Sequence, residues 1–131
     1  MQIDPEHLDH KAIYKLLTGS VIPRPIGWIS SVSNNGVNNL APFSYFNVVG
    51  DDPPHVMFST SRNNNKNKDT LNNILANNQF VVNMVTEDLV EQMNKTAEAI
   101  SPEESEFDFA NLTPVASVKI KPMRVKESKI N

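Results

Sequence analysis

The sequence lacks cysteine and has little glycine. No cysteine occurs among the 131 residues, which excludes disulfide frameworks, iron–sulfur clusters, zinc–thiolate sites and thiol nucleophiles together. The four glycines, Gly19, Gly27, Gly36 and Gly50, do not have the spacing of a dinucleotide-binding or nucleoside triphosphate-binding loop. Long apolar runs are also missing, and none approaches the roughly 20 residues of a membrane-spanning helix. Because the first residues carry no targeting signal, we expect a cytoplasmic protein without a membrane partner.

The sequence also has few basic residues. The 12 basic residues are outnumbered by 15 acidic residues, for a net charge of −3, whereas a nucleic-acid-binding surface needs an excess of bases. We therefore expect no nucleic-acid partner. Acidic residues gather between Glu87 and Asp108, in a stretch that predicts a solvated face. His7 and His10 could share a helix face but have no clear third ligand, so no metal site is predicted.

The arrangement of apolar residues predicts the fold class. With 39% hydrophobic residues the composition is typical of a globular protein, and the length predicts one domain over residues 1–131. Hydrophobic spacing and capping residues predict helices over residues 5–18, 70–78 and 86–97, and a helical turn over residues 101–104. Strands are predicted over residues 26–32, 38–49, 55–61, 79–85 and 114–121, the first three as an antiparallel meander. We therefore expect a fold that is mainly β with a few short helices.

A polar and basic run joins the third predicted strand to the helix over residues 70–78. Its hydroxyl-bearing, basic and helix-initiating residues are Ser59, Thr60, Ser61, Arg62, Lys68, Asp69 and Thr70. Free backbone N–H groups at a helix start favour an anion, arginine and lysine supply positive charge, and serine and threonine supply hydroxyl donors. The run therefore indicates a phosphate site without glycine. The alternative is a solvated loop whose hydroxyl groups cap the turn.

The second predicted strand combines small, polar and aromatic residues between Asn39 and Phe46. Because proline has no N–H group, we expect Pro42 to leave a ladder position unpaired and the strand to bulge there. A bulge would expose backbone groups to the edge of a planar heterocycle. The alternative is a bent barrel strand whose aromatic residues belong to the core. Trp28 has the same two interpretations, as a core residue or as a residue beside a ligand pocket.

Several blocks of the chain resemble one known family in the same order. The blocks are Tyr14 to Ser30, Asn39 to Ser44, Asp52 to Pro54, Lys68 to Thr70 with Asn73 and Ile74, Phe80 to Asn83, and Ser105 to Phe107 with Leu112 to Pro114. Together they are similar to the flavin reductase-like, FMN-binding split β-barrel family, which includes the flavoredoxins. The resemblance runs from about residue 2 to Ser128. Relatives continue beyond this length. The resemblance therefore implies that the chain corresponds to the N-terminal two thirds of the family's usual length, and we expect the C-terminal third to be missing and the barrel to be incomplete.

The resemblance implies that FMN is the cofactor, and it implies a place for each candidate residue. Asn39, Ala41, Pro42 and Ser44 would lie along the isoalloxazine ring, largely through backbone groups, with Trp28 and Ser30 near that ring. Ser59, Thr60, Ser61, Arg62, Lys68, Asp69 and Thr70 would hold the FMN phosphate. The resemblance also implies a homodimer with flavin near the subunit interface, so we expect a second copy of the chain as partner.

The implied activity is electron transfer from NAD(P)H through FMN to an acceptor, with a nicotinamide nucleotide as substrate. The flavin carries the redox chemistry, so no catalytic acid or base is expected among the protein side chains. Two alternatives remain open. One is an FMN-binding electron carrier that does not itself oxidise NAD(P)H, and the other is a truncated, inactive remnant, which the early stop at Asn131 favours.

Overall fold

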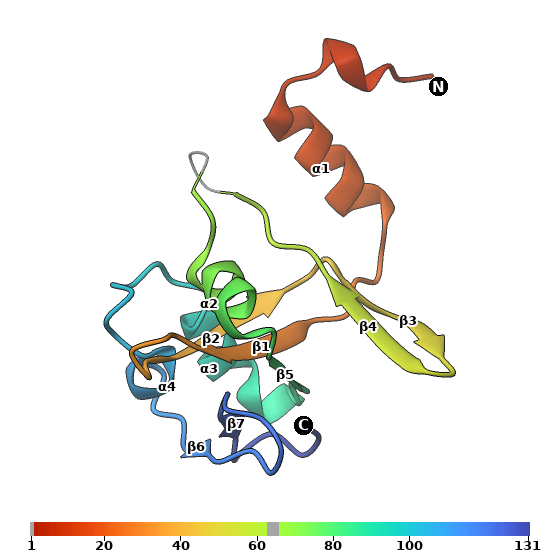
Figure 1. The fold of residues 1–131 in the computed structure, drawn as a ribbon. Helices are drawn as coiled ribbons and strands as arrows, with labels where there is room; N and C mark the ends of the chain where they lie inside the picture. Colours follow the sequence, from red (N-terminus) through yellow and green to blue (C-terminus); the bar gives the residue numbers. More distant parts are fainter. Residues whose placement is uncertain (1, 63–65) are drawn as a thin grey trace.

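The computed structural model describes residues 2–62 and 66–131 (Figure 1). Within these ranges the strands are β1 Gly27–Val32, β2 Asn38–Phe43, β3 Phe46–Asp51, β4 Pro54–Phe58, β5 Val81–Asn83, β6 Pro114–Val115 and β7 Arg124–Val125. The helices are η1 Pro5–His7, α1 His10–Ser20, α2 Asp69–Asn77, η2 Glu87–Leu89, α3 Val90–Lys95 and α4 Glu106–Phe109, where η marks a 3-10 turn. The expected fold class, mainly β with a few short helices, is confirmed.

The central sheet has three antiparallel strands in the order β2-β1-β5. All six residues of β1 are buried, as its central position requires. In the register, Trp28 lies opposite Pro42 on one side and opposite Asn83 on the other. Strands β3 and β4 form a separate hairpin, and β6 pairs with β7. The expected continuous meander is therefore wrong, because the predicted strand over residues 38–49 divides into β2 and β3, which belong to different sheets.

The break in that strand occurs at Ser44 and Tyr45, and no bulge occurs at Pro42. The pairing of β1 with β2 continues without a shift from Asn38 to Phe43. The N–H group of Leu40 points away from β1 to an acceptor on another element. Since orientation alternates along an antiparallel strand, the nitrogen of Pro42 also faces the outer edge, where no ladder hydrogen bond is lost.

The first predicted helix is divided by a second capping residue. Asp4 accepts a hydrogen bond from the N–H of Glu6 and caps η1, and Asp9 accepts one from Ala12 and starts α1. The helix then runs through Gly19 to Ser20, beyond residue 18, where the predicted helix ended. No residue of α1 is buried. This helix and the β3–β4 hairpin extend away from the rest of the chain (Figure 1).

The remaining predicted elements form with different bounds. The helix expected over residues 70–78 is α2, the strand over 55–61 is β4, and the strand over 79–85 shortens to β5. The helix over 86–97 becomes η2 followed by α3. The expected helical turn at 101–104 is a turn with capping hydrogen bonds, and the helix begins later, as α4. Only β6 survives from the strand expected over 114–121, and it pairs with β7, which was not predicted.

The two faces of the central sheet are covered differently. On one face lies the apolar cluster of Trp28, Leu40, Leu89, Phe107, Ala110, Leu112 and Val125. On the other face lies α2, whose Asn73 side chain donates to the hydroxyl of Ser31 (Figure 1). Side chains alternate between faces along a strand, so neighbouring residues of β2 point to opposite coverings. In the part of the chain that is described, no helix is long and apolar enough to cross a membrane.

Candidate functional site

The N-terminus of α2 lies beside strand β2, which brings the two predicted halves of the cofactor site together. The amide of Asn39 donates to the hydroxyl oxygen of Thr70 at 3.0 Å, and both residues are buried. The ammonium group of Lys68 lies 5.3 Å from the centroid of the Phe43 ring. No side chain caps the start of α2, where Lys68 occupies the capping position. Within the described ranges, the first N–H groups of the helix therefore have no side-chain acceptor.

The strand end at Ser59 lies at the corner between β2 and β3. The N–H group of Ser59 donates to the carbonyl of Tyr45 at 2.9 Å. Thr60 is half-buried, and Ser61 and Arg62 are exposed. These residues lead toward Lys68 through a segment that includes Asn63 to Asn65, which lie outside the described residues.

Arg24 fixes the same corner from the N-terminal side. Its guanidinium group donates to the hydroxyl of Ser44 at 2.7 Å and lies 5.7 Å from the centroid of the Tyr45 ring. Arg24 is not among the site residues predicted from the sequence. The segment from Asn39 to Ser44 is thus held at one end by α2 and at the other by Arg24.

An aromatic cluster supports the middle of this segment on the face that α2 covers. The rings of Phe43 and Phe58 lie 5.1 Å apart, and those of Phe58 and Phe80 lie 5.2 Å apart. Phe43 is buried. For this residue the structure supports the interpretation as an aromatic core residue. Ala41 and Ser44 remain half-buried beside it.

Trp28 and Ser30 lie on the opposite face of the sheet and have no exposed surface. The indole N–H of Trp28 donates to the hydroxyl of Thr96 at 2.9 Å. The hydroxyl of Ser30 donates to the carbonyl of Met123 at 2.6 Å and accepts from Asn83. Both side chains are therefore engaged in holding the sheet to the C-terminal segment. Of the other candidates, Asn39 and Thr70 are also buried. Those that are exposed or half-buried are Ala41, Pro42, Ser44, Ser59, Thr60, Ser61, Arg62, Lys68 and Asp69.

Glu106 is a buried acid that sequence reasoning missed. Its carboxylate accepts the N–H of Leu40 at 2.9 Å, and only 8% of the residue is exposed. Burial raises the pKa of the Glu106 carboxyl above its ordinary value, the Leu40 hydrogen bond opposes this rise, and the charge of Asp69 adds to it. Glu106 lies inside the acidic stretch that was expected to be a solvated face, so that expectation is wrong at this position. Its only signal in the sequence was membership of the block from Ser105 to Phe107.

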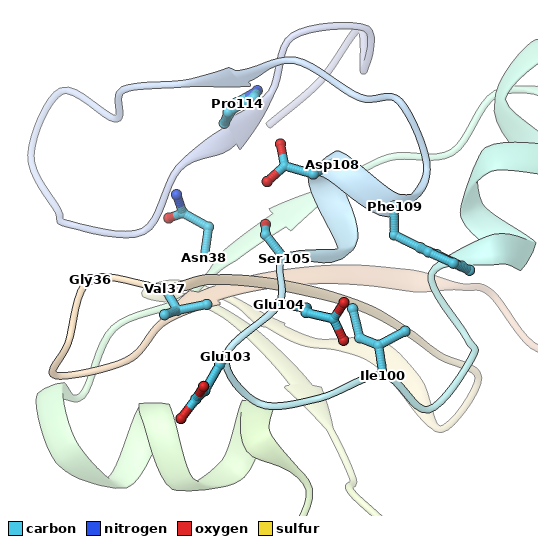
Figure 2. Close-up of a pocket in the computed structure, with 10 residues that line it drawn as sticks. All are labelled: Gly36, Val37, Asn38, Ile100, Glu103, Glu104, Ser105, Asp108, Phe109 and Pro114. Carbon is cyan, nitrogen blue, oxygen red and sulfur yellow. The ribbon is translucent and has the colours of Figure 1, made fainter.

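A separate hollow of about 560 Å³ lies between the β1–β2 turn and the segment that carries α4 (Figure 2). Its polar lining is acidic, with Glu103, Glu104 and Asp108 beside Ser105 and Asn38. No basic residue and none of the predicted cofactor-binding residues lines it. Carboxylates repel a phosphate group, so this hollow does not suit the predicted ligand. Among the described residues, no group of three His, Asp or Glu side chains could hold a metal ion.

Comparison with known proteins identifies the family. Residues 18–131 match the family model described as "Flavin reductase like domain". A protein of Aquifex aeolicus is 48% identical over all of this chain and 67% of its own length. The crystal structure of nitrilotriacetate monooxygenase component B from Bacillus cereus is 43% identical, with a TM-score of 0.94 over 98% of this chain and 63% of that one.

A chain with a split barrel domain from Shewanella frigidimarina shares the fold at 23% identity, with a TM-score of 0.79 over 98% of this chain and 64% of that one. The expected split β-barrel fold is therefore confirmed. The chain spans about two thirds of the length of these proteins, as the resemblance implied. The family model matches residues 18–131, and the Aquifex aeolicus protein is 48% identical along the whole of this chain. The chain therefore belongs to the flavin reductase-like family.

Proposed function

We propose that the chain binds FMN and transfers electrons from NAD(P)H through it to an acceptor. The observation that carries this proposal is the junction of β2 with the start of α2, where Asn39 bonds to Thr70. This junction places a strand segment that is fixed at both ends beside a helix N-terminus that is preceded by the basic residues Arg62 and Lys68. A flavin mononucleotide needs both features, because its planar ring and its phosphate must be held at the same time.

The residues at the start of α2 fit a phosphate group. Lysine is a poor N-terminal capping residue, and the helix has no side-chain cap. An anion placed there would accept from the free N–H groups and gain from the helix dipole. Lys68 and Arg62 supply positive charge, and the hydroxyl groups of Ser59, Thr60 and Ser61 supply donors. Asp69 is the exception. Its carboxylate would repel a phosphate group, so this residue would contribute only through its backbone N–H.

Bound FMN would supply the redox chemistry, since hydride and electron transfer are properties of the flavin. The segment from Asn39 to Ser44 would orient the ring, and the aromatic cluster behind Phe43 would exclude water from that face. No side chain is assigned as a catalytic acid or base. The name of the Bacillus cereus relative, component B of a monooxygenase, supports an acceptor that consumes reduced flavin. We also propose that residues 1–131 form one domain acting in the cytoplasm.

A second copy of the chain is the proposed partner, with FMN near the interface. The support lies in two apolar elements that extend from the body, α1 and the β3–β4 hairpin (Figure 1). Leu17 and Ile22 are 50% and 73% exposed, and Val48 and Met57 are 64% and 57% exposed. Exposed apolar surface of this extent is typical of an interface. The corner at Ser44 and Tyr45 lies where the hairpin leaves the sheet. This interface would therefore adjoin the segment from Asn39 to Ser44 that would orient the flavin ring, which we call the ring segment.

Titration with FMN, followed by quenching of flavin fluorescence, tests the proposal. We expect FMN to bind and riboflavin, which lacks the phosphate, to bind at least about tenfold more weakly, since an anion at a helix start with basic partners is worth more than 1.4 kcal/mol. The variant Lys68→Ala should reduce this preference, whereas Lys119→Ala, a change at an exposed lysine outside the site, should leave it unchanged. Absence of binding to either flavin would contradict the proposal and favour an inactive remnant.

Steady-state oxidation of NADH and NADPH with and without added FMN separates a reductase from an electron carrier. We expect oxidation of at least one nucleotide in the presence of FMN. A chain that binds FMN tightly but oxidises neither nucleotide would be a carrier.

A further inference from the structure

The buried carboxylate of Glu106 lies at the outer edge of β2, bonded to a residue of the segment that the proposed function assigns to the flavin ring. We infer that Glu106 is a positioning residue, which holds strand β2 in place to receive the ring through its hydrogen bond to the N–H of Leu40. The inference rests on the proposed function. It concerns how the chain orders its own strand, and Glu106 itself need not touch the cofactor.

The outer edge of β2 depends on this one side chain. Leu40 has no exposed surface, and its N–H points away from β1 toward α4, which lies against β2. Pro42, two residues further along the same edge, has no N–H group. The N–H of Leu40 is therefore the backbone donor at this buried part of the edge, and Glu106 is its acceptor. A buried N–H without an acceptor is costly, so the strand would shift to find water or another partner if Glu106 were lost.

The neighbouring residue ties the strand to the other half of the site. Asn39 bonds to Thr70 on α2 while Leu40 bonds to Glu106 on α4. Two successive residues of β2 are thus fixed from two different elements, just before Ala41. Asn39, Asp69 and Glu106 also line one small polar cavity of about 70 Å³ between these elements. A displacement of β2 at this level would move the segment from Ala41 to Ser44 relative to the start of α2.

The choice of an ionisable group at this position is costly for stability. Asp69 on α2 and Glu104 in the preceding loop share the cavity with Glu106, and both are acids. In residues 2–62 and 66–131 the only ion pair joins His7 and Asp4, so no base compensates Glu106. Buried ionisable groups without compensation are common at functional sites and rare elsewhere. The buried side chain of Glu106 therefore marks a functional position, and its hydrogen bond to the N–H of Leu40 connects that position to strand β2.

The inference predicts a pattern of binding that a phosphate contact would not give. Loss of Glu106 should disturb the ring segment and leave the phosphate contacts intact. FMN and riboflavin share the ring, so both should bind more weakly and by a similar factor. Glutamine keeps the side-chain length and an oxygen that can accept from Leu40, so Glu106→Gln should restore binding. A residue that only stabilises the fold would change the melting temperature but not this pattern.

The experiment measures the dissociation constants of FMN and riboflavin for the wild type, Glu106→Ala, Glu106→Gln and Lys68→Ala, with a thermal melt of each. We expect Glu106→Ala to weaken both flavins about tenfold or more, the loss of one buried hydrogen bond. Glu106→Gln should stay within about threefold of the wild type on the same scale. Lys68→Ala should weaken FMN alone, which makes it the matched control for the phosphate half.

Three results would overturn the inference. A folded Glu106→Ala variant with wild-type affinity for both flavins would show that the strand needs no support there. Equal weakening by Glu106→Ala and Glu106→Gln would assign the effect to charge and not to the hydrogen bond. If Glu106→Ala does not fold, Glu106→Asp replaces it, because the shorter side chain keeps the charge but no longer reaches the N–H of Leu40. The third contradicting result would be wild-type affinity for both flavins in this Glu106→Asp variant. Failure of the wild type to bind any flavin would instead refute the proposed function.

Discussion

Val125 donates its backbone N–H to the side-chain oxygen of Asn83 at 2.9 Å, and this bond connects strand β7 to the central sheet. The amide nitrogen of Asn83 donates to the carbonyl of Trp28 at 3.0 Å and to the hydroxyl of Ser30 at 3.2 Å. Asn131 donates to the same side-chain oxygen at 3.1 Å. Asn83 has no exposed surface, and its two donors and two acceptor positions are all engaged. One amide group therefore joins β1, β5, β7 and the C-terminal segment.

Replacement of Asn83 should destabilise the whole fold. Asn83→Ala leaves the N–H of Val125 without its acceptor and removes the donors to β1, so we expect a loss of about 2–4 kcal/mol in the free energy of unfolding. Urea denaturation measures this change. Asn34→Ala, at an exposed turn position, is the matched control and should change the free energy by less than about 0.5 kcal/mol. A variant at position 83 as stable as this control would contradict the assigned role.

The stability of the chain should depend on pH through Glu106. The pKa of its carboxyl is raised by burial, so ionisation costs more in the folded than in the unfolded state. The contribution of Glu106 is fully present below its ordinary pKa and is lost as the pH rises through the raised value. We therefore expect Glu106→Gln to gain stability relative to the wild type between pH 4 and pH 7. Denaturation at several pH values measures the difference, and a difference that shrinks as the pH rises would refute the prediction.

The single tryptophan should be inaccessible to solvent. Trp28 has no exposed surface, and its indole N–H is bonded to Thr96. We expect blue-shifted emission and almost no quenching by iodide in the folded protein, because a charged quencher cannot reach a buried ring. Denatured protein gives the fully quenched reference. Strong quenching under native conditions would show that the face of the sheet opposite α2 is open.

Charges introduced on the extended apolar elements should separate the proposed dimer. Leu17→Asp on α1 and Val48→Asp on β3 place charge on surfaces that a second copy would cover, which costs several kcal/mol at an interface. We expect these variants to sediment as monomers at concentrations where the wild type is a dimer. Lys15→Glu, on the same helix but at a polar position, is the control. If the wild type is monomeric throughout, the proposed partner is wrong.

The sequence predicted the elements that local interactions determine. The strand over residues 27–32 and its turn follow from β-branched and aromatic residues followed by Asn34, Asn35 and Gly36. The helix α2 follows from its apolar spacing, and Asn78, with φ of 57°, ends it in the left-handed conformation that asparagine tolerates. The phosphate-type run was found because charged and hydroxyl-bearing residues cluster within a short stretch of sequence.

Features that depend on distant partners could not be found in this way. The break at Ser44 depends on Arg24, and the two-residue strand β7 depends on Asn83. Glu106 looked like one more acid in an acidic stretch because nothing local marks its partner, Leu40, 66 positions earlier in the chain. Ser30 was placed near a ring by resemblance alone, and for Trp28 the sequence left open a core position or a position beside a ligand pocket. Only the three-dimensional contacts show that both face the apolar cluster.

The hydrogen bond between Ser30 and Met123 spans 93 positions of the chain. It can therefore form only after residue 123 has been synthesised. During synthesis, β1 and β2 can pair as soon as they leave the ribosome, since their contacts are local. The face of this hairpin that carries Trp28 and Leu40 is covered in part by Leu89, and its cover is complete only when residues 107–125 arrive. Contacts of such long range slow folding and leave apolar surface open in the meantime. The newly made chain should therefore depend on chaperones until residues 107–125 have been synthesised.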